Sequence, residues 1–223
     1  MKNYSLNDYF TTIYSKMFMG LSLTALVAYL IPYLFPTLFL SLLNNYKVIA
    51  IVCALVEIGL VIFIGSLMKN KNKNVTPWFY IYSVVNGITL SFIFGVINPY
   101  IVGMTFLVTA FVFGAFALIG ITTKKDLSAI GKFAIALLLG LIFATLVNVF
   151  IQSSMLDYVI SYAGVVIFSG LIAYDNQKIK NSYENSALHD NYNNITTWFA
   201  LDLYLDFINL FINILNLMNK LNN

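Results

Sequence analysis

Seven apolar stretches, each long enough to cross a lipid bilayer, constrain the fold of this 223-residue chain more than any other feature. A helix needs roughly 20 apolar residues to cross a hydrocarbon core of about 30 Å. Because nothing in that core can pair exposed backbone N–H and C=O groups, each stretch should be helical. The sequence therefore predicts an all-α integral membrane protein with one seven-helix domain over residues 1–223. The expected spans are residues 17–39, 47–68, 77–97, 100–121, 131–152, 156–178 and 196–218.

The composition limits which partners and cofactors are expected. Hydrophobic residues make up 60% of the chain and charged residues only 9%, whereas about a quarter of a soluble domain is charged. The net charge of +3 comes from twelve lysines without any arginine, which disfavours bidentate recognition of phosphate. We therefore expect the lipid bilayer as a partner and no nucleic acid. With the single cysteine, Cys53, inside a span and no nucleotide or metal motif, we expect no cofactor.

The lysines predict the orientation in the membrane, because short lysine-rich loops stay in the cytoplasm. Ten of the twelve fall on one side of the expected topology, and only Lys47 and Lys220 fall on the other. We expect a bacterial inner (plasma) membrane protein with a cytoplasmic amino terminus and an outside carboxyl terminus. The polar segment 179–195 then forms a cytoplasmic loop, in which His189 is a solvated side chain. The ten are Lys2, Lys16, Lys69, Lys71, Lys73, Lys124, Lys125, Lys132, Lys178 and Lys180.

Four carboxyl groups are expected at membrane depth within the spans: Glu57, Asp175, Asp202 and Asp206. A carboxylate at the bilayer centre costs about 3 kcal/mol, so each one calls for a function and a partner. No lysine is expected at the same depth. Each carboxyl should therefore be protonated, share a proton with another carboxyl, face a water-filled cavity or bind a metal ion. Two facing carboxyls would titrate as a unit and form a pH switch.

The last span carries five polar side chains at spacings of 4, 3, 4 and 3 residues. At about 100° per residue, they fall within an arc of roughly 80° on one helix face. This polar stripe either lines an ion path or joins neighbouring helices through hydrogen bonds. Glu57 is likewise either part of the path or a protonated core residue. The stripe consists of Asp202, Asp206, Asn209, Asn213 and Asn216.

Helix rise indicates which carboxyls could meet. Asp175 lies about 26 Å along the sixth span, near its cytoplasmic end. Counted from the cytoplasmic end of the last span, Asp202 lies at about 8 Å and Asp206 at about 14 Å. Straight helices favour Asp202 as the partner of Asp175, whereas tilt or a water-filled vestibule would bring Asp206 into reach.

Four segments resemble the Bax inhibitor-1 family, also called the transmembrane Bax inhibitor motif family. The most specific is "LYLDFINLF" at 203–211, which is similar to the family's signature in its last span. The segment "YDNQKI" at 174–179 is similar to its Tyr-Asp-Thr-Gln pattern, with Asn176 in place of Thr. Supporting segments are "EIGLVIF" at 57–63 and "TTKKDLSAIGKF" at 122–133. The resemblance covers nearly the whole chain.

This resemblance implies a seven-helix bundle with the last helix at its centre. It also implies a pH-sensitive calcium leak gated by an aspartate pair, which by motif position is Asp175 and Asp206. Carboxylate oxygens suit Ca²⁺, so these two could also bind the transported ion. Glu57 matches the acidic residue of the family's second span. Asp202 is an extra acid one turn before the signature aspartate, where it could change how the pair titrates.

Two other functions remain open. The chain could regulate another membrane protein, for example a membrane protease, which predicts a co-purifying partner. It could also be an intramembrane aspartyl protease, since two aspartates on neighbouring spans describe such a site. The last span reads "LYLD" instead of the Gly-x-Gly-Asp that lets a substrate backbone approach. We therefore expect a channel and no enzyme.

Overall fold

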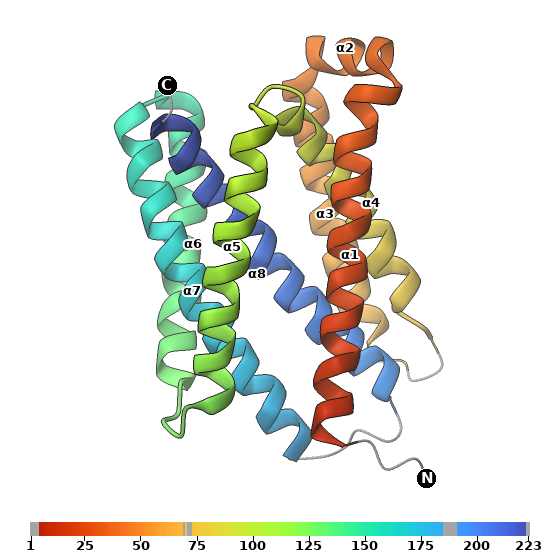
Figure 1. Ribbon diagram of the computed structural model, residues 1–223, viewed down its shortest axis with the longest axis vertical. Coiled ribbons are helices and arrows are strands. Elements are labelled where there is room, and N and C mark those ends of the chain that lie inside the picture. The colour runs from red at the N-terminus through yellow and green to blue at the C-terminus, as the bar shows by residue number, and fades with distance from the viewer. Residues whose placement is uncertain (1–4, 69, 71–72, 185–190, 222–223) are drawn as a thin grey trace. The chain divides into compact units, whose positions relative to one another are not determined.

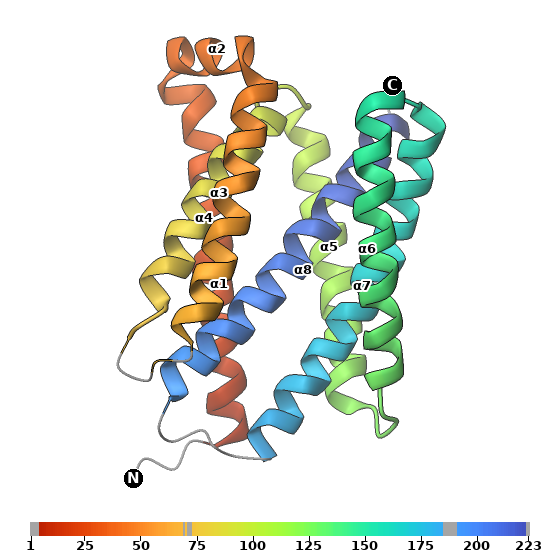
Figure 2. The same cartoon turned by 180° about the vertical axis from the view of Figure 1, so that it is seen from behind.

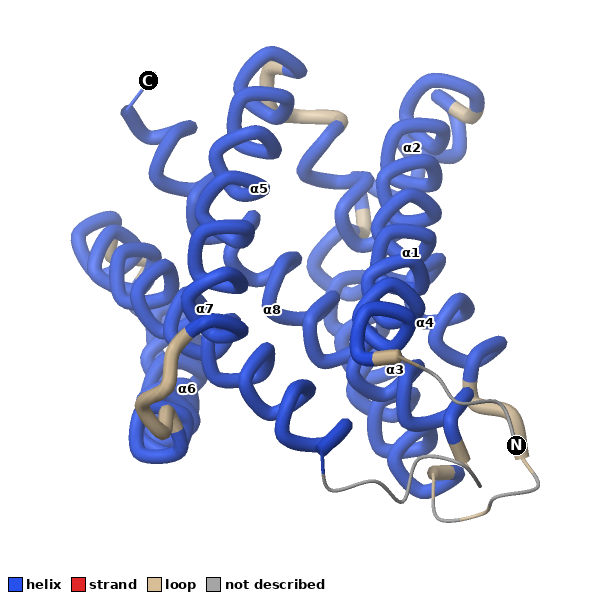
Figure 3. The backbone as a smooth tube through the Cα atoms, turned by 60° about the horizontal axis from the view of Figure 1, so that its bottom comes forward, coloured by secondary structure: helices blue, strands red, loops and turns tan. Residues whose placement is uncertain are grey.

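The computed structural model describes residues 5–68, 70, 73–184 and 191–221, and this part of the chain is helical without strands (Figure 3). His189 and three of the lysines used to predict orientation, Lys2, Lys69 and Lys71, lie outside the described residues. The helices are α1 (Leu6–Leu34), α2 (Pro36–Asn44), α3 (Tyr46–Leu67), α4 (Thr76–Phe94), α5 (Pro99–Thr122), α6 (Ser128–Ile151), α7 (Ser154–Glu184) and α8 (Tyr192–Leu221).

The chain divides into two compact units, with the boundary inside α8. The first unit contains α1 to α4 and α8 up to Tyr204, and the second contains α5 to α7 and α8 from Leu205 onward. One helix therefore contributes residues to the cores of both units.

In the first unit, α4 packs against both α1 and α3 (Figures 1 and 2). Glycines bring α1 and α4 close together, because a Cβ at Gly87 would lie only 2.7 Å from the Cβ of Val27. Tyr204 of α8 is fully buried, and its ring packs edge-on against Phe79 and Tyr82 of α4, with centroids 5.6 and 5.8 Å away. This aromatic cluster fixes the first half of α8 within the first unit.

In the second unit, α7 packs against both α5 and α6. A Cβ at Gly120 of α5 would collide with the carbonyl group of Ala173 on α7, so only glycine permits this approach. Likewise, a Cβ at Gly131 of α6 would overlap the ring of Tyr174. Phe207 of α8 packs against the ring of Phe113 on α5 at 5.6 Å.

Within the described part of the chain, six helices are long and apolar enough to cross a membrane: α1, α4, α5, α6, α7 and α8. In α3 the apolar stretch found among the described residues is the shorter Ile51–Leu67. The all-helical membrane architecture is therefore confirmed, whereas the seventh span stays a prediction.

The helix bounds differ from the expected span bounds at several places. The first helix begins at Leu6 and not at residue 17, because Ser5 and Asp8 form a capping box that starts it within the polar segment. That helix also ends at Leu34, and Pro36 begins the separate helix α2. Proline suits a first helical position, since its missing N–H would have no partner there.

The segment 179–195 is not all loop. Helix α7 continues to Glu184 and α8 begins at Tyr192, so helix occupies residues 179–184 and 192–195. Hydropathy predicts where an apolar span ends, whereas a helix ends where its backbone hydrogen bonding ends, so polar residues can continue it. Residues 185–190 lie outside the described part.

Helix α8 is the most buried of the six spans. In its most apolar stretch 72% of residues are buried, compared with at most 39% in the others. A helix surrounded by other helices requires such burial, and the central position of α8 itself stays a prediction.

Candidate functional site

Asp175 of α7 and Asp206 of α8 meet within the second unit. Their side chains are hydrogen-bonded to each other, and the two residues are only 9% and 5% exposed. Two carboxyl groups can form a hydrogen bond only when one of them carries a proton. That the pair shares a proton and titrates as a unit stays a prediction. The expected contact between these two residues is present, and their role in gating stays a prediction.

A lysine lies beside this pair, contrary to the expectation that the buried carboxyls lack a cation. The Nζ atom of Lys178 lies 3.5 Å from Oδ1 of Asp175, one turn along α7. The Lys178 side chain is 41% exposed, so its ammonium group reaches back from a partly solvated position. The site thus consists of two buried, neighbouring carboxyl groups with one positive charge at its edge.

The residues that follow Asp175 hold the site in place. Gln177 is buried, and its Oε1 accepts from the backbone N–H of Leu127 while its Nε2 donates to the carbonyl of Lys125, both at 2.8 Å. This amide fastens the α5–α6 loop to α7. The Nδ2 group of Asn176 donates to the carbonyl of Ile172 on its own helix at 2.8 Å. The motif around Asp175 therefore combines the acid with a structural clamp, a role that the sequence reading missed.

The asparagines of the polar stripe differ in their surroundings. The Nδ2 groups of Asn209 and Asn213 donate to the carbonyls of Leu205 and Asn209, four residues earlier on α8, at 2.8 and 2.7 Å. These donors consequently need no partner on another helix. Asn213 is buried and lies against Gly164 of α7, whereas Asn216 is exposed.

Asp202 belongs to the first unit, whereas Asp175 and Asp206 belong to the second. It is half-buried on α8, one helical turn before Asp206. That Asp202 joins the pair, or alters how it titrates, stays a prediction.

Glu57 lies in a separate hydrogen-bonded network in the first unit. Its Oε1 accepts from the hydroxyl of Thr89 on α4 at 2.7 Å, and the side chain of Asn86 is also hydrogen-bonded to it. The hydroxyl of Tyr204 donates to Oδ1 of Asn86 at 3.0 Å and lies 2.6 Å from the hydroxyl of Thr24. The network thus links α3, α4, α8 and α1. The groups hydrogen-bonded to Glu57 are neutral, and both its protonation state and its place in an ion path stay predictions.

Lys16 forms a further polar cluster that the sequence reading missed. It was interpreted as a lysine flanking the membrane, but it lies inside α1. Its Nζ donates to the carbonyl and Oδ1 of Asn193 and to the hydroxyls of Thr196 and Thr197, each at 2.8 Å. The hydroxyl of Thr197 also lies 2.8 Å from that of Thr76. The cluster joins the start of α8 to α1 and α4. The sequence signal for it was a single lysine inside a stretch that forms a helix.

The opposite end of α8 is anchored in the second unit. Lys220 lies 3.5 Å from the carboxylate of Asp157 and 4.5 Å above the ring of Tyr158. Asn148 of α6 donates to the same aspartate. These contacts join the ends of α6, α7 and α8.

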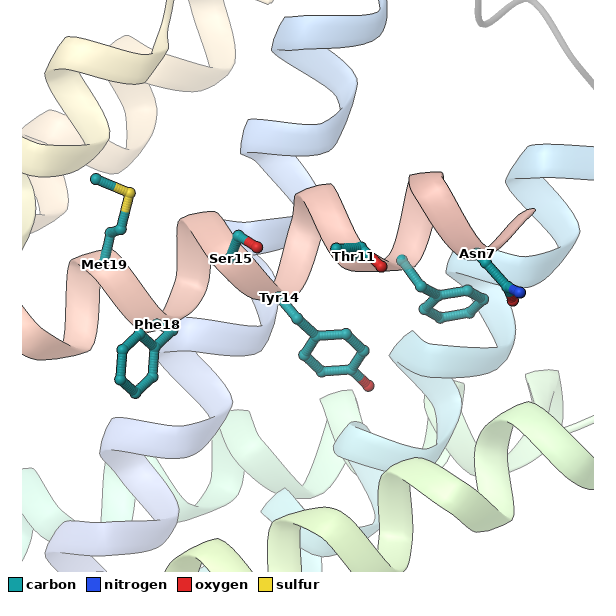
Figure 4. Close-up of a pocket in the computed structure, with 7 residues that line it drawn as sticks. Asn7, Thr11, Tyr14, Ser15, Phe18 and Met19 are labelled. Atoms are coloured by element: carbon teal, nitrogen blue, oxygen red, sulfur yellow. The ribbon is translucent and has the colours of Figure 1, made fainter. Parts of the chain in front are cut away.

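Among the described residues, two other kinds of candidate site are conceivable: a hollow on α1 and a cluster of metal-binding side chains. The hollow, about 610 Å³, is lined by residues of α1 alone and by no carboxylate or lysine (Figure 4). Among the described residues, no group of three or more His, Cys, Asp or Glu side chains is placed to hold a metal ion. Calcium binding by Asp175 and Asp206 stays a prediction.

The matches with known proteins run over nearly the full length of the chain. A family model described as "Inhibitor of apoptosis-promoting Bax1" matches residues 6–223. An uncharacterized membrane protein of Streptococcus pyogenes serotype M1 is 43% identical over 217 residues, 96% of this chain and 93% of that protein. The inner membrane protein YbhL of Escherichia coli is 39% identical over 218 residues, 96% and 92% of the two chains. An uncharacterized protein of Borreliella burgdorferi is 36% identical over 221 residues, 97% and 94% of the two.

Proposed function

Because the chain belongs to the family of inhibitors of apoptosis-promoting Bax1, the family that its motifs resemble, we propose that this multi-pass membrane protein is a pH-sensitive calcium leak channel. The observation that carries the proposal is the buried, hydrogen-bonded pair of Asp175 and Asp206. A shared proton between two helices makes their contact sensitive to pH. The choice of calcium as the transported ion rests on the family resemblance.

In the proposed mechanism, the shared proton holds α7 and α8 together at the aspartate pair. Loss of that proton leaves two negative charges side by side, which repel each other and attract a divalent cation. The ammonium of Lys178, 3.5 Å from Asp175, repels an entering cation. The two states therefore differ in both helix contact and local charge.

Calcium is the transported substrate in this mechanism. Ca²⁺ takes six to eight oxygen ligands, and the pair alone offers fewer. A transported ion must leave its site again, so it must bind weakly. An incomplete set of ligands therefore suits a channel better than a permanent calcium site. The path would follow the polar stripe of α8, with Asn209 and Asn213 as further oxygen donors.

Calcium flux into proteoliposomes across a range of pH tests the gating pair. We expect Asp206→Asn and Asp175→Asn to abolish the pH response, because an amide cannot share an ionisable proton. Asp126→Asn is the matched control, since Asp126 lies in the exposed α5–α6 loop. Hydrogen bonds from Ser128 hold the pKa of Asp126 below its usual range, so it stays ionised near neutral pH. Unchanged flux and pH response in both pair variants would refute the gating role.

We propose transport without catalysis. An aspartyl protease needs its two carboxyls open to a substrate backbone, whereas Asp175 and Asp206 are buried on helices without a glycine beside Asp206. Incubation with a transmembrane peptide should therefore yield no cleavage. Cleavage that disappears in Asp206→Asn would establish an enzyme instead.

A further inference from the structure

An apolar groove runs between α5 and α6 in the second unit. Both helices pack on α7, whose residues form the floor of the groove. Its volume is about 610 Å³. Between Leu127 and Leu137, two residues that line it, α6 rises about 15 Å, half the thickness of a hydrocarbon core. The groove therefore has the length of one bilayer leaflet. Representative lining residues are Val112, Phe116, Ile119, Ile130, Phe133 and Gly170.

Positive charge gathers at one end of this groove. Leu127 lines that end and belongs to the α5–α6 loop, which also carries the exposed side chains of Lys124 and Lys125. The loop is held there, because Gln177 of α7 binds the backbone of both Lys125 and Leu127. The one acid in the loop, Asp126, accepts a hydrogen bond from the N–H of Ser128 at 2.9 Å. With two lysines and one aspartate, the loop keeps a net positive charge at this end of the groove.

A second groove serves as an internal comparison. It lies between α6 and α7, has a volume of about 650 Å³ and is also apolar, with Gly140 and Leu156 among its lining residues. It extends toward the opposite end of α6, where the nearby charges are Asp157 and Lys220, which pair with each other at 3.5 Å. The two grooves are similar in size and chemistry but differ in charge at their ends.

We propose that the α5–α6 groove binds an acyl chain of an acidic phospholipid whose phosphate lies against Lys124 and Lys125. The apolar walls accept the chain, the length matches one leaflet, and the lysines complement the negative headgroup. A basic pocket between transmembrane helices is a known form of recognition for acidic lipids. The site is distinct from the aspartate pair and does not depend on channel activity.

Native mass spectrometry of the full-length protein in detergent, with phosphatidylglycerol or phosphatidylcholine of identical acyl chains, tests the headgroup contact. We expect the wild-type protein to retain phosphatidylglycerol several-fold more strongly. Lys124→Ala and Lys125→Ala should each lower that retention by about fivefold, the general attraction of one membrane-proximal lysine. Lys73→Ala, which removes an exposed lysine from the α3–α4 loop, should leave it unchanged.

A pair of glycine variants tests the groove itself. A Cβ at Gly170 would meet nothing closer than 3.7 Å, and one at Gly140 would meet nothing within 4 Å, so a Cβ fits at both positions. Gly170→Leu should fill the α5–α6 groove and reduce phosphatidylglycerol retention, whereas Gly140→Leu should fill the second groove without that effect. Equal retention of both lipids by the wild type overturns the proposal. An equal loss in Lys73→Ala, or no loss in Gly170→Leu, also overturns it.

Discussion

Asn213 fits between α7 and α8 of the second unit only because residue 164 is glycine. A Cβ at Gly164 would overlap the amide group of Asn213. We expect Gly164→Ala to lower the free energy of unfolding by about 1–3 kcal/mol, the usual cost of overpacking. Gly140→Ala is the matched control, because its Cβ would meet nothing within 4 Å and alanine favours a helix by about 1 kcal/mol over glycine. Thermal unfolding in detergent measures both.

A double variant separates this overlap from a general helix effect. If the amide is the obstacle, Gly164→Ala combined with Asn213→Ala should be more stable than the sum of the two single variants predicts. Strict additivity, or equal stability of Gly164→Ala and Gly140→Ala, would contradict the close packing at this position.

At the residue scale, the sequence could predict candidate site residues but not which of their side chains are in contact. Motif positions singled out Asp175 and Asp206, and these two are hydrogen-bonded. Depth counting along straight helices favoured Asp202, because it ignores how helices tilt. The position of Lys178 beside Asp175 was missed for a related reason, since a long side chain can place its charge far from its own Cα. Contacts depend on the direction of side chains, which spacing alone does not determine.

At the scale of elements, Lys16 fixes where α8 begins. Its ammonium has three N–H groups, which are shared among four oxygen atoms of residues 193–197, each 2.8 Å away. We expect Lys16→Met to loosen this turn by about 2 kcal/mol, because hydrogen bonds to a charged group are lost while the alkyl part is kept. Hydrogen exchange of a peptide covering residues 192–200 should accelerate. Lys73→Met, at an exposed lysine, should leave that peptide unchanged, and unaltered exchange in Lys16→Met would contradict the anchoring role.

Helix boundaries show what a sequence can reveal about elements. The start of α1 could be found, since Ser5 and Asp8 have the spacing of a capping box, but the hydropathy argument passed over it. The continuation of α7 to Glu184 could not be found from hydropathy, because that segment is polar. Hydropathy reports the thickness of the membrane, whereas helix ends depend on caps and on packing beyond it.

At the scale of the whole molecule, the lysine distribution makes a definite prediction about topology. The α5–α6 loop holds Lys124 and Lys125, whereas the α4–α5 connection, residues 95–98, has no lysine. By the positive-inside rule, the first loop should be cytoplasmic and the second outside. We expect a membrane-impermeant maleimide to label Val96→Cys in intact bacterial cells, and Lys125→Cys only after the membrane is opened. Both variants need a Cys53→Ser background, because Cys53 is the single native thiol. Both positions are exposed in the structure, so a failure to label cannot be attributed to burial. Labelling of Lys125→Cys in intact cells, with Val96→Cys protected, would reverse the orientation and place both termini opposite to the prediction.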